Sequence, residues 1–435
     1  MKWLAGAILI LVIALLFGFD LLAYAMYVLL AVMLISRYLT KTWSESLSAS
    51  RECSLLSAEV GQNVAVVVTL KNTGRWPVAW VLLEDLLPAD ALIFNPPRLQ
   101  VGGKRVQLTM LKAAGRKSML YQLTPTRRGY YQLGPLVLET GDLFGLHRRY
   151  RVLTDPQFLM VLPKVLPLAG YDVSSKRPIG EVRMTYRLYE DPTRISGVRA
   201  YERGDPMNRV HWRATARTGQ LHSKVYEPST VAGATLLLEF HMRAHERKHE
   251  PHRSELAVTA AASIANAVYL MNQQIGLVTN GRDAVDRIRQ EGWAHDYRSR
   301  AAALASASVK DKSDRLAPLI VQTRRGPEQL MRILETLARV ELTDGLPLPA
   351  LIDEASSRMP RDATVIAILP PGSRESAAAL GNLRRRGFAV TALVNMFDDY
   401  DFAEAAAPLL AEGIGVKQLK DEGSIMEICR RLALR

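Results

Sequence analysis

The start of the chain consists of two long apolar runs with one short break between them. Trp3–Phe19 is apolar or small throughout, and Leu21–Ile35 is apolar again before Arg37 and Lys41. The residues Gly18-Phe19-Asp20 suit a turn between the runs. Each run would form a helix of about 25 Å, and flanking aromatic residues would complete a hydrocarbon core of about 30 Å. The pattern predicts a transmembrane helical hairpin over residues 1–41.

A signal peptide is the alternative for this segment, because Lys2, an apolar run and Ala23-Tyr24-Ala25 match its three parts. Cleavage there would leave a chain that begins inside the second apolar run, so we favour the hairpin. Cations lie before the first run and after the second, whereas the turn carries only Asp20. The positive-inside rule then places both ends of the hairpin, and the soluble domains, in the cytoplasm.

From Ser48 to Leu166 the chain alternates between apolar and polar residues and is divided by turn signals such as Lys71-Asn72-Thr73-Gly74. The expected strands are Val64–Leu70, Val78–Leu87, Arg105–Leu111, Ser118–Thr124, Tyr130–Leu138 and Arg149–Leu153. Short strands at this spacing, without a helical period between them, are typical of two packed sheets. We therefore expect a β-sandwich domain over residues 48–166.

From Gly233 onward, apolar strands alternate with helical patterns. The expected strands are Ala234–Phe240, Ile275–Thr279, Ala363–Leu369, Ala389–Val394 and Ile414–Val416, and the expected helices are Ser254–Asn272, Pro327–Val340, Arg374–Arg386, Phe402–Ala411 and Ser424–Leu432. Strands buried on both faces and separated by helices predict an α/β domain with a doubly wound parallel sheet over residues 233–435. Such sheets bind ligands beyond the carboxyl ends of their strands.

Length and charge narrow the class of protein. A chain of 435 residues is long enough for two or three domains. The net charge of +13 fits anionic lipid beneath a membrane anchor, and we expect no nucleic-acid partner because no nucleic-acid-binding module is recognisable. The two cysteines, Cys53 and Cys429, lie far apart, so the sequence indicates no disulfide framework.

Residues 167–232 connect the two domains and contain a dense polar and aromatic segment, Ser196–Leu221. Its charged or titratable residues are Arg199, Glu202, Arg203, Asp205, Arg209, His211, Arg213 and Arg217, and its large aromatic residues are Tyr201 and Trp212. Gly204 before Asp205-Pro206 predicts a turn, and Arg209–Arg217 reads as irregular or strand-like.

Three interpretations of this segment remain open. It forms a buried ion-pair and aromatic network that joins the two domains, or a surface that docks a partner protein. In the third, His211 serves as acid or base together with Asp205 or Glu202. A nucleophile, metal cage or cofactor loop does not accompany these residues in the sequence, so we expect no cofactor and favour the first two interpretations.

Four histidines fall close together after the first strand of the α/β domain: His241, His245, His249 and His252. The spacing of the first three would place them on one face of a helix, where imidazoles chelate transition metals. The intervening cations and Pro251 favour an exposed loop instead. His241, His245 and His249 are therefore weak metal candidates.

The segment also resembles a known family. The run Arg199-x-Tyr201-x-x-Gly204-Asp205-x-x-x-Arg209-Val210-His211-Trp212-x-x-x-Ala216-Arg217 is similar to the signature of the bacterial domain-of-unknown-function 58 proteins. Leu221–Glu227 continues the similarity, and Gly141-Asp142-Leu143-Phe144-Gly145-Leu146 adds to it. The resemblance implies a double membrane anchor, an immunoglobulin-like sandwich and an α/β domain of von Willebrand factor A type.

A-type domains often carry a metal site that begins with Asp-x-Ser-x-Ser at the end of the first strand. The matching positions here are Glu239, His241 and Arg243. Because both hydroxyl ligands are missing and a cation is present, the oxygen cage that Mg²⁺ requires is lost. We therefore expect no magnesium at this position.

For function, the resemblance implies work with a MoxR-type AAA+ ATPase in the assembly or maturation of other proteins. The leading hypothesis is a non-enzymatic adaptor anchored by two helices in the bacterial inner membrane, with its soluble domains in the cytoplasm. An alternative is a metal-dependent or hydrolytic enzyme that uses His211 and Asp205 or the His241–His252 cluster. A receptor that faces outward would need the opposite topology.

Overall fold

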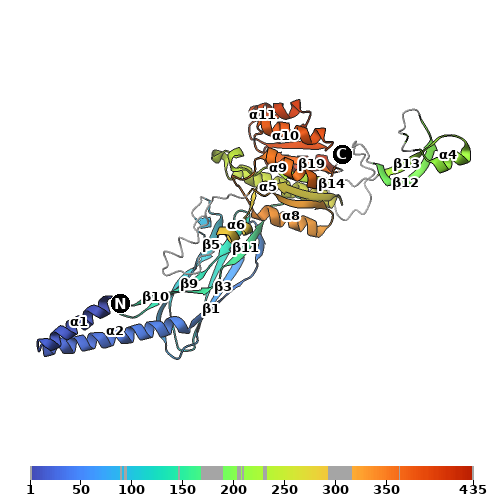
Figure 1. Cartoon of the computed structure of the whole chain (residues 1–435). Coiled ribbons are helices and arrows are strands. Elements are labelled where there is room, and N and C mark those ends of the chain that lie inside the picture. The colour runs from blue at the N-terminus through green and yellow to red at the C-terminus, as the bar shows by residue number, and fades with distance from the viewer. Residues whose placement is uncertain are drawn as a thin grey trace. The chain divides into compact units, whose positions relative to one another are not determined.

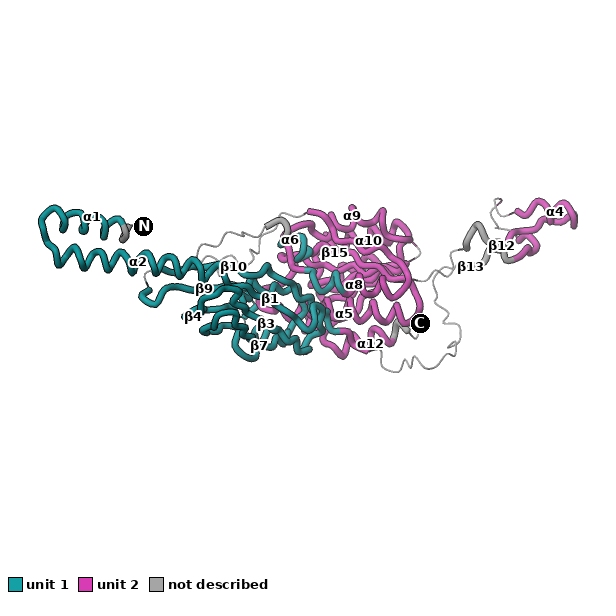
Figure 2. Tube along the Cα trace, turned by 90° about the horizontal axis from the view of Figure 1, so that it is seen from below, with its two compact units in different colours: residues 1–164, 283–312, 335–340 teal, residues 165–282, 313–334, 341–435 magenta. Residues whose placement is uncertain are grey.

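A computed structural model describes residues 2–88, 91–92, 96–145, 147–167, 190–202, 207, 210–228, 233–291, 316–361 and 363–433. The chain forms two compact units (Figure 2). Unit 1 comprises Met1–Lys164, Asp283–Lys312 and Glu335–Val340, and unit 2 comprises Val165–Arg282, Ser313–Leu334 and Glu341–Arg435. Figure 1 labels their helices and strands.

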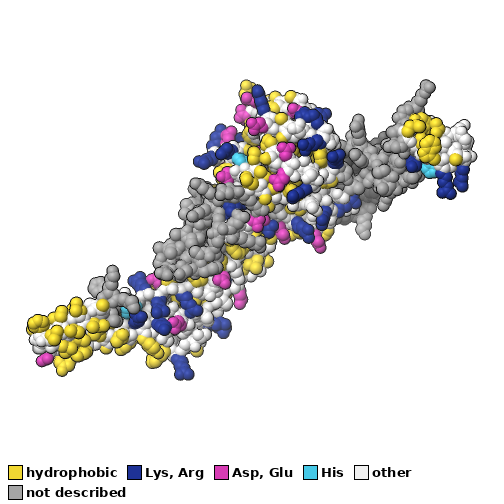
Figure 3. Space-filling model, in the orientation of Figure 1, with side chains coloured by type: hydrophobic (Ala, Val, Ile, Leu, Met, Phe, Trp, Pro, Cys, Tyr) yellow, Lys and Arg dark blue, Asp and Glu magenta, His cyan; other side chains and the backbone are white. Residues whose placement is uncertain are grey.

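Unit 1 begins with two helices that contact each other, α1 (Lys2–Leu16) and α2 (Asp20–Ser46). Gly18 has φ of 68° in the turn between them, so the predicted turn is confirmed. With 27 residues and a mean hydropathy of 1.8, α2 is long and apolar enough to cross a membrane. Exposed apolar side chains cover both helices (Figure 3). Apolar residues Ala5–Leu16 of α1 form a shorter helix, so the second span and the orientation stay predictions.

The second helix continues beyond residue 41, where the predicted hairpin ends. It passes Arg37 and Lys41 and ends at Ser46. Arginine and lysine are good helix formers, so their charge does not end a helix. The extension also packs on the β domain, because α2 contacts β9 and β10 and the side chain of Trp43 lies in the core of the sheets.

The β part of unit 1 contains two four-stranded antiparallel sheets and one three-stranded sheet. The first sheet has the order β1 (Leu47–Cys53), β3 (Val64–Asn72), β7 (Arg116–Pro125) and β5 (Leu99–Gly103). The second has the order β10 (Arg148–Thr154), β9 (Leu136–Gly141), β4 (Val78–Asp85) and β6 (Val106–Leu111), and the third has β2 (Ser57–Glu59), β11 (Gln157–Leu162) and β8 (Gly129–Leu133).

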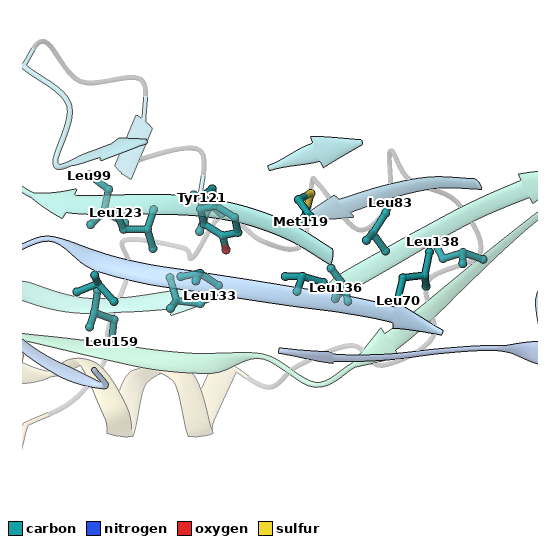
Figure 4. Close-up of a cluster of buried hydrophobic side chains, with 14 of the residues drawn as sticks. Leu70, Leu83, Leu99, Met119, Tyr121, Leu123, Leu133, Leu136, Leu138 and Leu159 are labelled. Atoms are coloured by element: carbon teal, nitrogen blue, oxygen red, sulfur yellow. The ribbon is translucent and has the colours of Figure 1, made fainter. Parts of the chain in front are cut away.

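The three sheets share one hydrophobic core. Leu70 of β3, Leu83 of β4, Leu123 of β7, Leu133 of β8 and Leu159 of β11 all belong to it (Figure 4). Alternate residues of β3 are buried, as expected for a strand with one face on a core. The period-2 pattern read from the sequence therefore corresponds to the inner faces of real sheets.

The predicted strand Tyr130–Leu138 is wrong, because this stretch forms two strands in different sheets, β8 and β9. Gly134 has φ of 91°, which suits glycine, and Pro135 has no N–H to give to a ladder. The N–H of Gly134 donates instead to the carbonyl oxygen of Leu86, at 2.7 Å. The chain thus leaves one sheet and enters the next at these two residues.

Unit 2 contains a six-stranded sheet with the order β17-β15-β14-β19-β20-β21. The strands are β14 (Gly233–Leu238), β15 (Gln274–Thr279), β17 (Leu319–Arg324), β19 (Thr364–Leu369), β20 (Val390–Asn395) and β21 (Gly415–Leu419). Neighbouring strands are parallel except for β17, which runs antiparallel to β15 and was not predicted. Because β14 lies between β15 and β19, the strand order reverses beside it.

Helices cover both faces of this sheet. The helices of this unit are α5 (His252–Leu270), α9 (Leu348–Ala355), α10 (Arg374–Arg385), α11 (Asp399–Ala411) and α12 (Glu422–Ala433), and α8 (Pro327–Arg339) begins in it. Helix α6 (Ala284–Glu291) belongs to unit 1; the short strand β16 (Arg282–Asp283) precedes α6 in the chain, and β18 (Val340–Glu341) follows α8. Helices α9, α10 and α11 share a core with Leu237, Val365 and Val394, whereas α5 contacts the same strands outside that core. The predicted alternation of strands and helices is confirmed.

Candidate functional site

The signature segment forms a small element of its own. Strands β12 (Glu190–Ala200) and β13 (His222–Pro228) pair antiparallel, and the helix α4 (Trp212–Thr218) lies between them in the chain. Two backbone bonds close the segment: Tyr201 N–H donates to the Leu221 carbonyl oxygen at 2.9 Å, and His211 N–H donates to the His222 carbonyl oxygen at 2.8 Å. The strands thus provide a hydrogen-bonded base that holds α4.

Helix α4 corrects the expectation that Arg209–Arg217 is irregular or strand-like. The Nδ1 atom of His211 accepts a hydrogen bond from the backbone N–H of Ala214 at 3.0 Å and so caps the start of the helix. Gly219 ends the helix with φ of 71°, and its N–H donates to the carbonyl oxygen of Thr215. His211 therefore has a structural task, because its Nδ1 lone pair is occupied while the cap is formed.

The surface of this element is apolar and basic. Trp212, the first residue of α4, is 64% exposed, and Met207, which precedes the helix, is 65% exposed. Arg213 and Arg217 on α4 are exposed beside them. Figure 3 shows hydrophobic and basic side chains gathered over this element. We call Met207, Trp212, Arg213 and Arg217 the α4 surface.

The described part of the segment contains an exposed ion pair, and the buried network that would join the two domains stays a prediction. Arg199 Nη1 lies 3.4 Å from Glu202 Oε1, and both side chains are exposed. Such surface pairs contribute little to stability. Gly204, Asp205 and Arg209 lie outside the described residues, so the expected partnership of His211 with Asp205 stays a prediction.

A second polar cluster lies after β14, at the carboxyl ends of the parallel strands. Glu239 is 6% exposed, and burial raises the pKa of its carboxyl group to about 7, although the nearby His245 acts in the opposite direction. The Nε2 atom of His245 lies 3.2 Å from the Glu239 carbonyl oxygen, and its Nδ1 atom lies 3.0 Å from Glu250 Oε1. Both ring nitrogens therefore lie within hydrogen-bonding distance of an oxygen atom, which fixes the orientation of the ring.

Glu250 holds the other side of His245. Burial alone would raise the pKa of the Glu250 carboxyl group, but hydrogen bonds from His245 and Ser254 outweigh burial and lower it. The hydroxyl group of Ser254 donates to Glu250 Oε2 at 2.5 Å. The ring of His245 also packs edge-on against Phe240 at a centroid distance of 5.6 Å. His245 is thus fixed on all sides as a structural group.

The histidines do not share one helical face. Two short 3₁₀ turns, Met242–Ala244 and Arg247–His249, replace the helix that the spacing would need. His241 Nδ1 accepts from the backbone N–H of Arg243 at 3.2 Å, and His249 packs on Phe397. Within the described ranges, His, Cys, Asp and Glu side chains do not gather in groups of three or more that could hold a metal. The expectation of an exposed loop is also wrong for His245, which is buried.

Sequence reasoning missed three residues of this edge: Arg253, Asn280 and Asn395. Arg253, in the first turn of α5, is 5% exposed, and its guanidinium lies 5.2 Å from the centre of the Phe397 ring. Asn395 Nδ2 donates to the Arg253 carbonyl oxygen at 2.7 Å, and Asn280 Oδ1 accepts from Phe240 N–H at 2.6 Å. The available signal was an asparagine at the end of a buried strand. Asn280 directly follows β15, and Asn395 is the last residue of β20.

Comparison with known proteins identifies one family and one distant relative. Residues 197–318 match the family model described as "Protein of unknown function DUF58". The chain is 26% identical over 274 residues to "Uncharacterized protein YeaD" of Bacillus subtilis (strain 168), which covers 62% of this chain and 66% of that protein. The aligned part thus spans just under two thirds of that relative's length.

Solved structures give only weak similarities. They include a CARDB domain from Pyrococcus furiosus, with 15% identity, a TM-score of 0.18 and coverage of 27% of this chain and 87% of that one. Another is proximal thread matrix protein 1 from the mussel byssus, with 9% identity, a TM-score of 0.28 and coverage of 47% and 48%. Scores this low carry no argument. The resemblance to the domain-of-unknown-function 58 proteins is confirmed for residues 197–318, the part of the chain that contains the signature.

Proposed function

We propose that the protein is a membrane-tethered adaptor without catalytic activity of its own. In this proposal α1 and α2 anchor the chain in the bacterial inner membrane, and the α4 surface binds a partner protein, a MoxR-type AAA+ ATPase. The partnership would serve the assembly or maturation of other proteins.

The exposure of Trp212 is the observation that carries the proposal. It is 64% exposed and lies on a helix held by caps at both ends, beside the exposed Arg213 and Arg217. Tryptophan and arginine are enriched among the residues that dominate the energy of protein interfaces. A rigid helix that presents both side chains loses little entropy on binding.

We also propose a specific fold type for each of the two units. The strand order of unit 2 is 3-2-1-4-5-6 in chain order with an antiparallel third strand, and we assign it to the von Willebrand factor A type on that ground. Two four-stranded antiparallel sheets around one core support an immunoglobulin-like sandwich in unit 1. At the edge of unit 2, His241 and His245 are engaged in hydrogen bonds, which supports an adhesion-type edge that has lost its magnesium site.

Co-purification tests the adaptor function. The full-length protein would be solubilised from membranes together with the MoxR-type ATPase of the same organism. We expect Trp212→Ala to lose the ATPase, and Tyr400→Ala, which removes another exposed aromatic residue of unit 2, to retain it. Equal capture by the two variants would refute the α4 surface as the binding site, provided that both are produced at the level of the native protein.

Topology is tested separately. A fluorescent protein fused to the carboxyl terminus folds in the cytoplasm, and an alkaline phosphatase fused there is active only outside it. We expect fluorescence and no phosphatase activity, because the cations flank the hairpin on the side of the soluble domains. The opposite result would favour a receptor that faces outward.

A further inference from the structure

The turn between β9 and β10 presents two large apolar side chains to the surroundings. Leu143 is 75% exposed and Phe144 is 70% exposed. We call Asp142, Leu143, Phe144, Gly145 and His147 the β9–β10 tip. Figure 2 shows that its two strands belong to unit 1, and both strands contact α2.

The β9–β10 tip is a fixed turn. Asp142 Oδ1 accepts from the backbone N–H of His147 at 2.6 Å, and Oδ2 accepts from the N–H of Phe144 at 3.2 Å. Trp80 Nε1 donates to the Asp142 carbonyl oxygen at 3.3 Å, and Gly145 takes φ of 73°. The aspartate thus organises the turn from inside, and the two apolar side chains point away from the protein at little entropic cost.

Hydrogen bonds place this turn along the length of α2. Arg151 Nη1 donates to the carbonyl oxygens of Ser44 at 2.9 Å and of Leu47 at 3.4 Å. Arg51 Nη1 donates to the Asp155 carbonyl oxygen at 3.3 Å, so β10 runs in the same direction as β1, which continues the chain from α2. The start of β10 and the turn before it therefore lie beside earlier residues of α2.

The level of the turn follows from the rise per residue. Arg148 precedes Arg151 by three residues, which corresponds to about 10 Å along a strand. The same distance along a helix corresponds to about seven residues, so Arg148 lies level with the residue seven positions before Ser44. That level is Arg37, and Leu143 and Phe144 lie beyond it, beside the end of the apolar run. A hydrocarbon core of about 30 Å takes about 20 helical residues from Asp20, so it ends near Thr40. By this reckoning the two apolar side chains lie near the level at which the apolar part of α2 ends.

The charges around the turn fit the same boundary. The side chains of Arg148 and Arg149 are 67% and 43% exposed, and Arg37 and Lys41 of α2 are exposed as well. Arg148 lies 3.5 Å from Glu139, and Arg149 lies 4.0 Å from Glu45, which are weak surface pairs. Cations near a bilayer gain about 1 kcal/mol each from anionic lipids.

We propose that the β9–β10 tip inserts into the interface of the membrane that α2 crosses. Leu143 and Phe144 enter the boundary between headgroups and acyl chains, and Arg148 and Arg149 bind anionic lipid headgroups. The combination of apolar side chains and flanking cations is that of interfacial membrane anchors. This second contact would hold the β domain in one orientation on the bilayer. The inference rests on α2 as a membrane span and is independent of the partner of the α4 surface.

Lipid-phase quenching tests the insertion. The full chain, with Cys53→Ala and Cys429→Ala, would be reconstituted in nanodiscs of phosphatidylcholine and phosphatidylglycerol. An environment-sensitive fluorophore would be attached at Phe144→Cys, at Gln62→Cys as the control, and at Ala31→Cys in α2 as the reference. Gln62 is exposed and lies beyond the opposite end of β3, about 30 Å from the membrane-proximal end of that strand.

We expect nitroxide lipids to quench the label at position 144 several times more strongly than the label at 62. Quenching at 31 but not at 144 would overturn the inference alone. If the label at position 31 is not quenched either, both the membrane span of α2 and the inference are refuted. Capture of the ATPase is measured in a separate experiment, so the proposed function is tested independently.

In the same nanodiscs, Arg148→Gln with Arg149→Gln should weaken the quenching at 144, and this loss should vanish without phosphatidylglycerol. An unchanged signal would refute the headgroup contact.

Discussion

Arg51 and Asp85 form a doubly hydrogen-bonded ion pair inside the β domain, with side-chain exposures of 1% and 0%. Arg51 Nε donates to Asp85 Oδ2 at 2.8 Å, and Nη2 donates to Oδ1. The hydroxyl group of Tyr121 donates to Asp85 Oδ2 at 2.7 Å, and Arg51 Nη1 donates to the Leu133 carbonyl oxygen at 2.9 Å. These residues come from β1, β4, β7 and β8, so the cluster ties the three sheets together at their centre.

Arg51→Met is expected to destabilise unit 1 by about 3–5 kcal/mol, because it leaves the Asp85 carboxylate buried without its cation. Denaturant unfolding of the full chain in detergent measures this loss. Replacing both partners, with Arg51→Met and Asp85→Leu, should cost less than the single change. A single change that costs less than about 1 kcal/mol, the range of an exposed ion pair, would contradict the buried pair.

Gly134→Ala is expected to destabilise the same domain by more than about 2 kcal/mol. Gly134 has φ of 91°, and a Cβ atom there would collide with the guanidinium group of Arg51. Gly61→Ala is a matched control, since Gly61 has φ of 86° and open space around it, so it should cost only about 1 kcal/mol. The difference between the two unfolding free energies isolates the collision. Equal losses would show that Arg51 moves aside freely.

The stability of unit 2 should fall as the pH rises from 4.5 through about 7. The pKa of Glu239 is about 7 in the folded protein against an ordinary value of 4.5, so the folded state binds the proton more tightly in this window. Since one tenfold difference in proton affinity is worth about 1.4 kcal/mol, the full effect approaches about 3 kcal/mol. Unfolding at several pH values measures it, and Glu239→Gln should abolish this slope. A slope that persists in the variant would assign it to another group.

Glu250 is expected to change the stability of unit 2 with pH in the opposite direction to Glu239, and at lower pH. Its pKa is lowered in the folded protein by the hydrogen bonds from His245 and Ser254, which outweigh its burial. This contribution to stability is complete above the ordinary value of 4.5 and is lost as the pH falls through the folded value. Glu250→Gln should therefore remove a loss of stability in acid and leave the slope between pH 4.5 and 7 unchanged. Loss of both slopes in this variant would show that the two carboxyl groups titrate together.

Periodicity predicted most of the elements because their cores are regular. The strands β3, β7, β14, β19 and β20 match the predicted runs within a few residues, since buried strands need unbroken or alternating apolar residues. The misses have physical causes. Gly134-Pro135 moves the chain between sheets without interrupting its apolar character, and α2 continues past residue 41 because one of its faces packs on the β domain.

The site was harder to predict than the fold. The spacing of the histidines is helical, but the chain after β14 forms 3₁₀ turns that send His241, His245 and His249 to different partners. Arg253 and Asn395 lie far apart in sequence and meet only because α5 packs beside β20. A pattern along the chain cannot show such a contact. The cap that His211 makes was equally hidden, because histidine is not a common cap residue.

The variant His211→Asn distinguishes the proposed adaptor function from the alternative, an enzyme that uses His211. Asparagine is a good helix cap and would accept the hydrogen bond from the N–H of Ala214, but it cannot transfer protons as an imidazole does. If His211 serves only as a cap, the Asn variant retains capture of the ATPase, and His211→Ala loses part of it through a weaker cap worth about 1 kcal/mol. The readout is the amount of ATPase co-purified from membranes, with Thr218→Ala as a control in the same helix. Equal loss of capture in the Asn and Ala variants would show that the imidazole itself is needed, and the catalytic interpretation would then regain support.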